Sequence, residues 1–321
     1  MKLLSDLSNY MDLDILELIS NYLTAPRKYK EFEINKKNGG KRKIAQPSKE
    51  LKEYQYAIVD SLINKFPIHE CATAYCRHKS IYNNALPHKN SSWVLKLDFK
   101  DFFHSIRPEH FSFYINRQYE NVSQIEIDIL NHYLFWLDSS DKKLKLSIGA
   151  PSSPILSNVI MYEFDKKVAD ICSEFCTIYT RYADDITLSA DLRDDLLKVE
   201  VKLRELIDET QIPLLILNED KRVLIGKNKS KRVTGVVITH ENKLSVGRYK
   251  RKKVRAMLYR YSNNSLDSKD IPLLHGTLSY INLVEREYYN KLINQYGEAL
   301  FNKLARQSFT VSKLKYEPKT V

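Results

Sequence analysis

Apolar side chains recur with the three-to-four-residue period of an amphipathic helix in several long segments. The clearest segment is 154–175, where Ile, Val and Phe repeat on one face and Pro154 occupies the first turn, a position that proline favours. A basic stretch over residues 250–321 also has helical character. The same spacing predicts further helices over residues 12–23, 49–65, 108–135 and 192–210.

Short runs rich in Val, Ile, Tyr and Thr lie between these helices and predict strands. Residues 29–34 and 42–45 flank a basic turn that contains two glycines, so they should form a hairpin. From residue 93 the predicted order is strand, helix, helix, hairpin, helix, strand, which is typical of a split βαβ sheet with helices on one face. We therefore expect an α+β fold. Its strands are predicted at residues 93–99, 177–182, 186–190 and 214–217.

Three carboxylates stand at the ends of predicted strands. Asp184 and Asp185 fall at the tip of the second hairpin, and Asp98 ends the buried strand that precedes it. Carboxylates that converge can hold hard divalent cations, of which one activates an attacking hydroxyl and another steadies a leaving phosphate. Without metal, this concentration of charge would raise the carboxylate pKa values. The pattern predicts a two-metal phosphoryl-transfer site, and the alternative is a turn with solvent-exposed acids.

The positive charge of the chain is concentrated in one segment. The formal net charge is +11, yet residues 221–260 contain 14 Lys or Arg and one acid, a net charge of +13. Aromatic side chains interleave these cations at Tyr249, Tyr259 and Tyr261. This combination suits a nucleic-acid backbone with bases or sugars packed alongside, and it suits a membrane surface less well because no long apolar face accompanies it.

The composition bounds the class of protein. A chain of 321 residues with 43% apolar side chains can bury a large core and form two or three subdomains. It has no segment typical of a signal peptide or a membrane span, so we expect a cytoplasmic protein without membrane contact. Four cysteines have poor spacing for zinc, and reduced structural thiols are the favoured interpretation of Cys71, Cys76, Cys172 and Cys176.

Several motifs, in this order, are typical of polymerases that copy nucleic acid. They are Asp98 within Leu97–Phe103, the turn Gly149–Pro154, the hairpin tip Tyr182–Asp185 and the segment Asn218–Lys221. Two further elements narrow the group, namely Asn84-Ala85-Leu86-Pro87-His88 and Val233-Thr234-Gly235. With them the chain resembles the bacterial retron reverse transcriptases over roughly residues 29–297. It departs from the usual motif at Ser147-Ile148, where reverse transcriptases have Pro-Gln.

The resemblance implies a right-hand polymerase with fingers, palm and thumb, whose palm is a split βαβ, ferredoxin-like sheet. We expect an N-terminal helix and fingers over residues 1–92, a palm over 93–240 and a basic helical thumb over 241–321. A segment around residues 110–150 would be an insertion that belongs to the fingers.

The resemblance also assigns roles around the acidic hairpin, with two Mg²⁺ ions as cofactors and Mn²⁺ as a substitute. Lys221 would act as a general acid near the leaving pyrophosphate, or would contact a phosphate. Asp101 is explained at least as well by a capping or salt-bridge role as by a metal. The expected metal ligands are Asp98, Asp184, Asp185 and the backbone carbonyl of Phe99.

The nucleotide site is expected beside these acids. Phe103 matches the bulky residue that packs against the sugar and excludes a 2′-hydroxyl; a plain core phenylalanine is the alternative, and it is favoured for Phe102. A turn of small residues would let template and nucleotide approach the backbone, and two cations of the leading hairpin would hold phosphates unless they are surface charges only. The expected nucleotide-binding residues are Phe103, Arg42, Lys43, Gly149, Ala150 and Pro151.

Nucleic-acid contacts are expected in three places. By resemblance, the element that contains Asn84 and His88 contacts the cognate RNA, although a His in a loop is more often a structural hydrogen-bonding group. Val233-Thr234-Gly235 would grip the primer end, or would be an ordinary strand with a glycine bulge. The remaining candidates are cations, namely Arg77 and Lys79 after the first hairpin and Arg248, Lys250, Arg251, Lys252 and Arg255 in the thumb.

The resemblance implies a defined reaction and defined partners. The chain would use deoxynucleoside triphosphates to copy a cognate non-coding RNA (msr–msd), starting from a 2′-hydroxyl of an internal guanosine and yielding branched RNA–DNA (msDNA). A separate effector or toxin protein would accompany it in phage defence. The alternatives are an intron-encoded or diversity-generating reverse transcriptase, the first disfavoured because no room remains for an appended domain, or a non-catalytic RNA-binding scaffold with the same fold.

Overall fold

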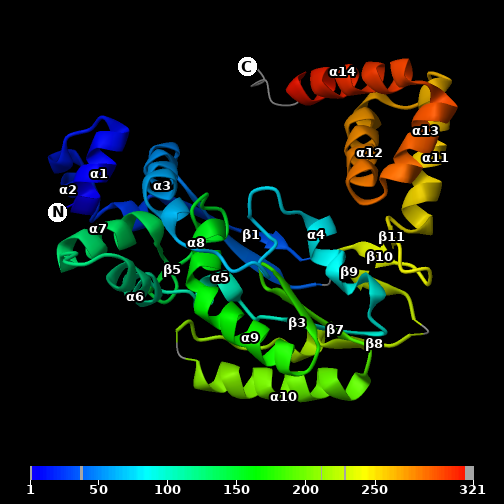
Figure 1. Cartoon of the computed structure of the whole chain (residues 1–321). Coiled ribbons are helices and arrows are strands. Elements are labelled where there is room, and N and C mark those ends of the chain that lie inside the picture. The colour runs from blue at the N-terminus through cyan, green and yellow to red at the C-terminus, as the bar shows by residue number, and fades with distance from the viewer. Residues whose placement is uncertain (1, 37–38, 211, 228, 315–321) are drawn as a thin grey trace. The chain divides into compact units, whose positions relative to one another are not determined.

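The computed structural model describes residues 2–36, 39–210, 212–227 and 229–314 (Figure 1). The chain divides into two units, and each is described by itself. The larger unit comprises the chain up to Ser80 together with Ser91–Lys227, and the smaller unit comprises Ile81–Asn90 together with the chain beyond Lys227. The expected borders of fingers, palm and thumb are functional assignments and stay predictions.

A four-stranded antiparallel sheet forms the centre of the larger unit. Its order is β6-β7-β3-β8, with β6 Ile178–Tyr182, β7 Asp185–Ala190, β3 Trp93–Asp98 and β8 Val223–Ile225. Helices α9 (Tyr162–Glu174) and α10 (Arg193–Glu209) pack against the sheet and against each other (Figure 1). This order and the helices on one face confirm the expected split βαβ, ferredoxin-like palm and the α+β class.

The last strand of this sheet differs from its prediction. Residues 214–217 alternate exposed and buried side chains as a strand does, which explains the expectation. In the structure Leu214 belongs to a turn, and Leu217 forms an isolated bridge with Phe99. The fourth strand of the sheet is instead β8, which follows this segment in the chain and pairs with β3. Periodicity alone does not tell a flanking segment from a paired strand.

Two predicted helices are each divided in the structure. The segment 154–175 consists of α8 (Ser153–Ile160) and α9, with Met161 between them, and 108–135 consists of α6 (Pro108–Gln118) and α7 (Gln124–Leu134). Ser123 and Glu126 form a capping box at the start of α7, and this local signal marks the break. The other elements of the larger unit are α1 (Lys2–Met11), α2 (Ile15–Asn21), α3 (Lys49–Ser61), α5 (Phe102–Ser105), the predicted hairpin β1 (Tyr29–Asn35) with β2 (Lys41–Pro47), and the short pair β4 (Trp136–Leu137) with β5 (Leu144–Lys145).

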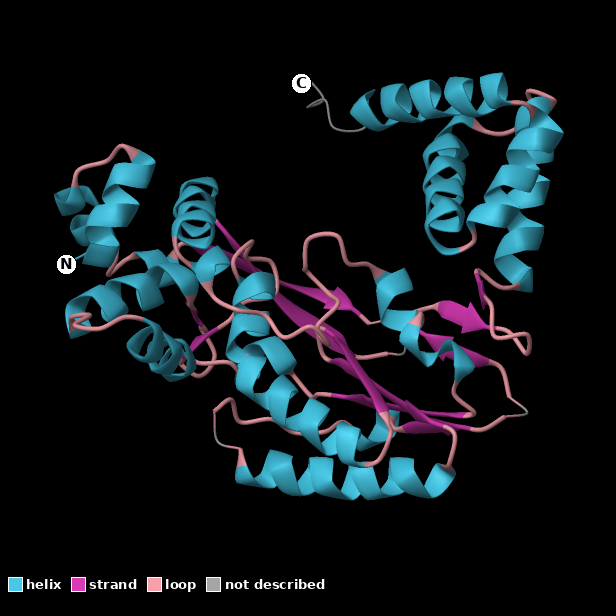
Figure 2. Cartoon of the chain, in the orientation of Figure 1, coloured by secondary structure: helices cyan, strands magenta, loops and turns pink. Residues whose placement is uncertain are grey.

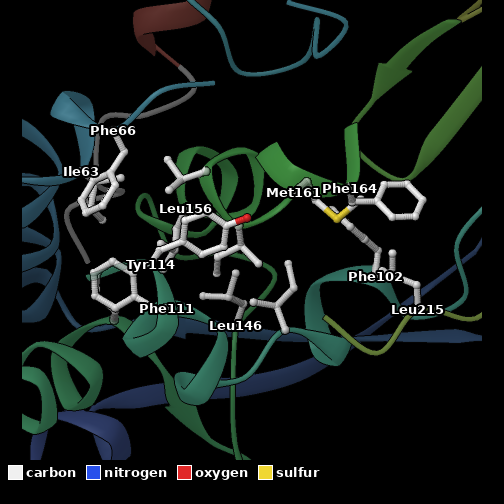
Figure 3. Packing of buried hydrophobic residues seen from close by; sticks show 14 of the residues in the cluster. Ile63, Phe66, Phe102, Phe111, Tyr114, Leu146, Leu156, Met161, Phe164 and Leu215 are labelled. Carbon is white, nitrogen blue, oxygen red and sulfur yellow. The ribbon is translucent and has the colours of Figure 1, made fainter. Parts of the chain in front are cut away.

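A continuous hydrophobic core joins these helices to the sheet. Figure 3 shows Phe111 and Leu156 in one part of this core and Phe102, Phe164 and Leu215 in another. Each large apolar side chain that is fully buried contributes roughly 1.5–3 kcal/mol to stability. Because Phe102 is 3% exposed within this core, the interpretation of Phe102 as a core residue is the one that the structure supports.

The smaller unit combines a small sheet with a bundle of helices (Figure 2). Strands β9 (Lys231–Val233), β10 (Val236–Ile238) and β11 (Leu244–Ser245) pair in the order β11-β10-β9, and α4 (Ile81–Ala85) contacts β9 and β10. The helical character predicted for residues 250–321 is found in α11 (Arg248–Ser262), α12 (Ile271–Val284), α13 (Arg286–Tyr296) and α14 (Glu298–Leu314). Within the described ranges, no helix has both the length and the apolar character that crossing a membrane requires.

Candidate active site

The sheet brings the three predicted acids together. Asp98 is the last residue of β3 and lies opposite Asp185, the first residue of β7, in the register of the sheet. Asp184 stands in the two-residue turn between β6 and β7, since Tyr182 pairs with Asp185 across that turn. The backbone N–H of Phe99 donates to the carbonyl of Asp184 at 3.1 Å and ties the two strand ends together. We call Asp98, Asp184 and Asp185 the acidic cluster.

Burial and mutual repulsion raise the pKa of two carboxylates of the acidic cluster. Burial, followed by the charge of Asp184 and a hydrogen bond with Asp98, raises the pKa of Asp185 to about 6. Burial and the charge of Asp98 raise the pKa of Asp184 as well. The Lys221 ammonium donates to Oδ1 of Asp98 at 2.6 Å. Burial lowers the pKa of Lys221, but this hydrogen bond and the surrounding carboxylates outweigh it, so its pKa lies above its usual value.

The residues of the cluster fit a divalent metal in their chemistry. Carboxylate oxygens are the ligands that Mg²⁺ and Mn²⁺ prefer, and the raised pKa values mark negative charge that a cation would stabilise. Across the described ranges of the chain, however, no group of three or more His, Cys, Asp or Glu side chains is already arranged to hold a metal ion. In the structure Asp98 pairs with Lys221. The metal roles of the three acids and of the Phe99 carbonyl stay predictions.

A pocket of about 360 Å³ in the larger unit unites most of the predicted nucleotide residues. Phe103 meets Tyr75 edge to face there, with 6.4 Å between the ring centroids. Gly149 has a φ of 128°, and a Cβ at this position would lie 3.0 Å from the carbonyl oxygen of Ala45, so only glycine fits without a shift. The pocket is lined by Lys52, Tyr56, Tyr75, Phe103, Ser147, Ile148, Gly149, Ala150, Pro151, Ser153 and Pro154.

Three of the pocket residues belong to none of the motifs that the sequence suggested, namely Tyr75, Lys52 and Tyr56. Tyr75 lies two residues before Arg77, one of the predicted nucleic-acid-binding cations, yet nothing in the sequence distinguishes its ring from an ordinary surface tyrosine. In the structure it has a φ of 59°, in the left-handed region that a bulky side chain rarely adopts. Such backbone strain is concentrated at functional sites. Lys52 and Tyr56 lie on α3, where helical spacing predicted only the buried face.

The predicted phosphate-binding cations divide into two groups. Arg42 is exposed on β2, and its charge counters the raised pKa of Asp184, which places it near the acidic cluster. Lys43 lies on the other face of the same strand, since successive side chains alternate. Its ammonium donates to Asp138 at 2.6 Å and pairs with Glu31 at 2.9 Å, so the structure does not bring it into the pocket.

Two other predicted cations and Asp101 lie outside the pocket lining. Arg77 is exposed, whereas the Lys79 ammonium donates to the backbone carbonyls of Glu70 and Ala72 and so closes its own loop. Asp101 precedes α5 with a φ of 49°, and its side chain makes no capping hydrogen bond. The capping role considered for Asp101 is therefore wrong. The nucleic-acid contacts of Arg77 and Lys79 stay predictions.

Two elements that are 150 residues apart in sequence meet within the smaller unit. The Asn84 amide donates to the hydroxyl of Thr234 at 3.3 Å, and Asn84 and His88 have no exposed surface. Burial lowers the pKa of His88 to about 3, so its ring is neutral at pH 7. The hydroxyl of Tyr280 donates to the Gly235 carbonyl at 3.1 Å, next to the buried Val233. The first contact holds α4 to the small sheet, and the second holds α12 to it. An RNA contact of Asn84 or His88 stays a prediction.

The five predicted cations of α11 have two different environments. The Arg251 guanidinium pairs with the nearly buried Glu285 and lies 4.7 Å from the ring centroid of Tyr288. The Lys250 ammonium lies 3.9 Å from the ring centroid of Tyr280. Both therefore stabilise the smaller unit itself. The remaining three, Arg248, Lys252 and Arg255, are exposed at helical spacing on one side of α11, and we call them the basic face.

Comparison with known proteins agrees with this geometry. The family described as reverse transcriptase (RNA-dependent DNA polymerase) matches residues 34–238. The fold, the converging acids and this match define a polymerase, and the chain is an RNA-directed DNA polymerase.

The particular group follows from the relatives. The chain is 35% identical over 301 residues to the Retron Ec83 reverse transcriptase of Escherichia coli, covering 93% of this chain and 95% of the relative, and 31% identical over 310 residues to the Retron Ec86 reverse transcriptase of the same species, covering 94% and 92%. The chain belongs to the retron reverse transcriptases. Among solved structures, an apo telomerase from Candida tropicalis aligns with a TM-score of 0.49 at 14% identity, covering 93% of this chain and 68% of the telomerase.

Proposed function

We propose that this reverse transcriptase copies a cognate structured non-coding RNA (msr–msd) into DNA that remains joined to it as branched RNA–DNA (msDNA). The observation that carries the proposal is the acidic cluster at the paired ends of β3 and β7, in a chain whose relatives are retron reverse transcriptases along nearly their whole length. Three carboxylates with too little compensating charge are the chemistry that metal-assisted phosphoryl transfer needs.

The reaction begins at a 2′-hydroxyl of an internal guanosine in the RNA. Its oxygen forms a bond to the α-phosphorus of a deoxynucleoside triphosphate, the bond from that phosphorus to the bridging oxygen breaks, and pyrophosphate leaves; each later step uses the new 3′-hydroxyl. Asp98, Asp184, Asp185 and the carbonyl of Phe99 would hold two Mg²⁺ ions, which supply charge stabilisation to the attacking and leaving oxygens. The hydroxyl proton passes to solvent. Lys221, whose ammonium donates to Asp98, would protonate pyrophosphate once it releases that carboxylate.

The pocket beside the acids would receive the incoming nucleotide. Phe103 and Tyr75 present two aromatic rings, and the Gly149–Pro151 turn presents bare backbone. A flat ring against the sugar excludes a 2′-hydroxyl by sterics, which selects deoxynucleotides. Arg42 would hold phosphates, and this proposal is supported by its exposure and by its charge, which counters the raised pKa of Asp184.

The partners in this proposal are the cognate RNA, its RNA–DNA product and a separate effector protein with which the enzyme acts in phage defence. The basic face of α11 supports a polyanionic partner, because exposed like charges at helical spacing repel one another unless a polyanion lies across them. Deoxynucleoside triphosphates are made in the cytoplasm, so we also place the reaction there.

The chemical structure of the DNA product tests this proposal. The purified chain is incubated with an RNA transcribed from its own locus, deoxynucleotides and Mg²⁺, and the product is digested with ribonuclease. We expect DNA that keeps a 2′-linked ribonucleotide at its 5′ end, which a debranching enzyme releases, and no product from Asp184→Asn. Synthesis that occurs only from an added oligonucleotide primer would overturn the branched-product proposal and leave a general reverse transcriptase.

A further inference from the structure

Behind the acidic cluster lies an ion pair with no exposed surface, formed by Arg181 and Asp165. Nε and Nη2 of Arg181, on β6, donate to the two carboxylate oxygens of Asp165, on α9, at 2.8 and 2.6 Å. The hydroxyl of Tyr179 donates to the same carboxylate at 2.7 Å. Removing two charges from water is costly, and apolar residues of similar size often replace such a pair without loss of stability. Stability alone therefore does not explain why these residues are charged.

The remaining terminal nitrogen of Arg181 donates a hydrogen bond to the turn between β6 and β7, which contains Asp184. Its Nη1 donates to the carbonyl oxygen of Ala183 at 3.0 Å. Ala183 has a φ of 57° and is the first residue of the two-residue turn between β6 and β7, a position that glycine favours in such hairpins. An alanine in this conformation is strained, because its Cβ crowds the following carbonyl oxygen. The hydrogen bond from Arg181 thus holds a strained peptide immediately before Asp184.

The backbone of Arg181 also fixes the loop that carries Tyr75. Its N–H donates to the carbonyl of Cys71 at 2.9 Å, and its carbonyl accepts from the N–H of Thr73 at 2.9 Å. The amide of Asn158 then donates to the carbonyl of Ala74 at 2.8 Å, directly before Tyr75. One buried residue is therefore bonded both to the turn that contains Asp184 and to the loop that carries Tyr75, a residue of the pocket lining.

We propose that Arg181, oriented by Asp165, is a positioning residue that sets the Ala183-Asp184 peptide and with it the spacing of the Asp184 and Asp185 carboxylates opposite Asp98. Arg181 touches neither metal nor substrate in this arrangement, and it acts through the turn. The inference rests on the proposed metal-binding role of the acidic cluster.

The first test replaces Arg181 by an apolar side chain of similar length, Arg181→Met. We expect kcat to fall at least tenfold while affinity for the RNA stays within twofold. Binding of Ca²⁺ to the metal-free chain, followed by calorimetry, should weaken at least threefold, which reports on the carboxylates without turnover. The matched control is Lys145→Met. It removes a different cation of the same unit, whose side chain is 11% exposed and pairs with Asp138 at 2.7 Å. That variant should keep both kcat and Ca²⁺ affinity within twofold.

The second test asks whether the turn is the target of Arg181. Glycine adopts a positive φ without help, so Ala183→Gly added to Arg181→Met should restore kcat at least threefold, whereas Ala183→Gly alone should not raise it. If Arg181→Met does not fold because Asp165 is left unpaired, Arg181→Met with Asp165→Asn removes both charges and keeps an acceptor for Tyr179.

Three outcomes would overturn the inference: unchanged kcat and Ca²⁺ affinity in the folded variant, an equal loss in Lys145→Met, or no restoration by Ala183→Gly. These outcomes differ from a failure of the proposed metal site. Full DNA synthesis by Asp184→Asn would overturn the metal site, whereas normal synthesis by Arg181→Met beside an inactive Asp184→Asn would overturn only the positioning role.

Discussion

The acidic cluster of the larger unit and the basic face of the smaller unit both concentrate charge, but in opposite environments. Asp98 is 4% exposed, and burial is the leading cause of the raised pKa of Asp184 and Asp185. Arg248, Lys252 and Arg255 are exposed, and water solvates their charges. Buried charge stores unfavourable energy that one ligand in one geometry relieves, whereas exposed charge attracts any polyanion in proportion to the number of contacts. A single substitution in the acidic cluster should therefore abolish DNA synthesis, whereas each substitution in the basic face should lower RNA affinity by one step.

The largest expected effect tests the all-or-none side of this comparison. Asp98→Asn or Asp184→Asn removes a ligand from a site whose remaining oxygens cannot hold both ions, so DNA synthesis should fall by a factor of about 10³ or more. Affinity for the RNA should persist, because the basic face is untouched. Primer-extension assays and RNA titration measure the two quantities. Robust extension by Asp184→Asn would remove Asp184 from the catalytic machinery.

The next largest effect is expected on RNA binding by the basic face. Replacing Arg248, Lys252 and Arg255 together by Gln should weaken RNA binding by about a hundredfold at moderate salt and flatten the log–log salt dependence by roughly two to three units, one or slightly less for each phosphate that no longer meets a cation. RNA titrations at several salt concentrations measure both. A control with the same change of charge is Lys166→Gln, Lys167→Gln and Lys198→Gln, three exposed lysines of the larger unit. An unaltered slope in the first variant would mean that the basic face binds something other than nucleic acid.

Arg251 sharpens this comparison because it is a cation of the same helix with a different environment. Its contacts to Glu285 and Tyr288 lie within the smaller unit, so Arg251→Gln should leave Glu285 without its charged partner and lower thermal stability. The salt dependence of RNA binding should change by less than one unit. Thermal unfolding and the same titrations decide the matter, and a slope reduced by a full unit at unchanged stability would place Arg251 among the residues that bind RNA.

A smaller effect is expected on the selection of deoxynucleotides over ribonucleotides, which depends on the sugar of the incoming nucleotide. Phe103 is partly buried beside Tyr75 in the pocket, so Phe103→Ala should open space for a 2′-hydroxyl. Discrimination against ribonucleotides should fall more than tenfold, which corresponds to about 1.4 kcal/mol. The ratio of kcat/KM for a deoxynucleotide and its ribonucleotide measures this change, and Phe102→Leu, in the core, is the control that should keep the ratio. An unchanged ratio in Phe103→Ala would assign the selection to another residue.

Much of this comparison could be predicted from the sequence, because both features follow from local pattern. Strand periodicity placed Asp98 and the acidic hairpin at adjoining strand ends, and the density of Lys and Arg marked α11. Alternation along β2 would also have separated Lys43 from Arg42. Other features depend on contacts between residues that are distant in sequence. The ion pair of Arg181 with Asp165 joins a strand to a helix, and in the sequence alone Arg181 resembles an ordinary strand residue before the acids.

The smallest expected effect is a dependence of stability on pH that only the buried cluster should show. The pKa of Asp185 in the folded chain, about 6, lies above its ordinary value, so the folded state binds this proton more tightly than the unfolded state does. Without metal, stability should therefore rise as the pH falls from 7 through 6, by roughly 1 kcal/mol at pH 5.5. This contribution corresponds to about 2–4 °C in Tm for a unit of this size. Thermal unfolding in EDTA at pH 7.0 and 5.5 measures it, with Asp185→Asn as the reference in which the contribution is absent. Added Mg²⁺ should reduce the difference by stabilising the chain mainly at pH 7.0, where the carboxylates are ionised. Equal pH dependence in the parent chain and in Asp185→Asn would mean that the acids of the cluster are solvated like the cations of α11, and the contrast between the two regions would disappear.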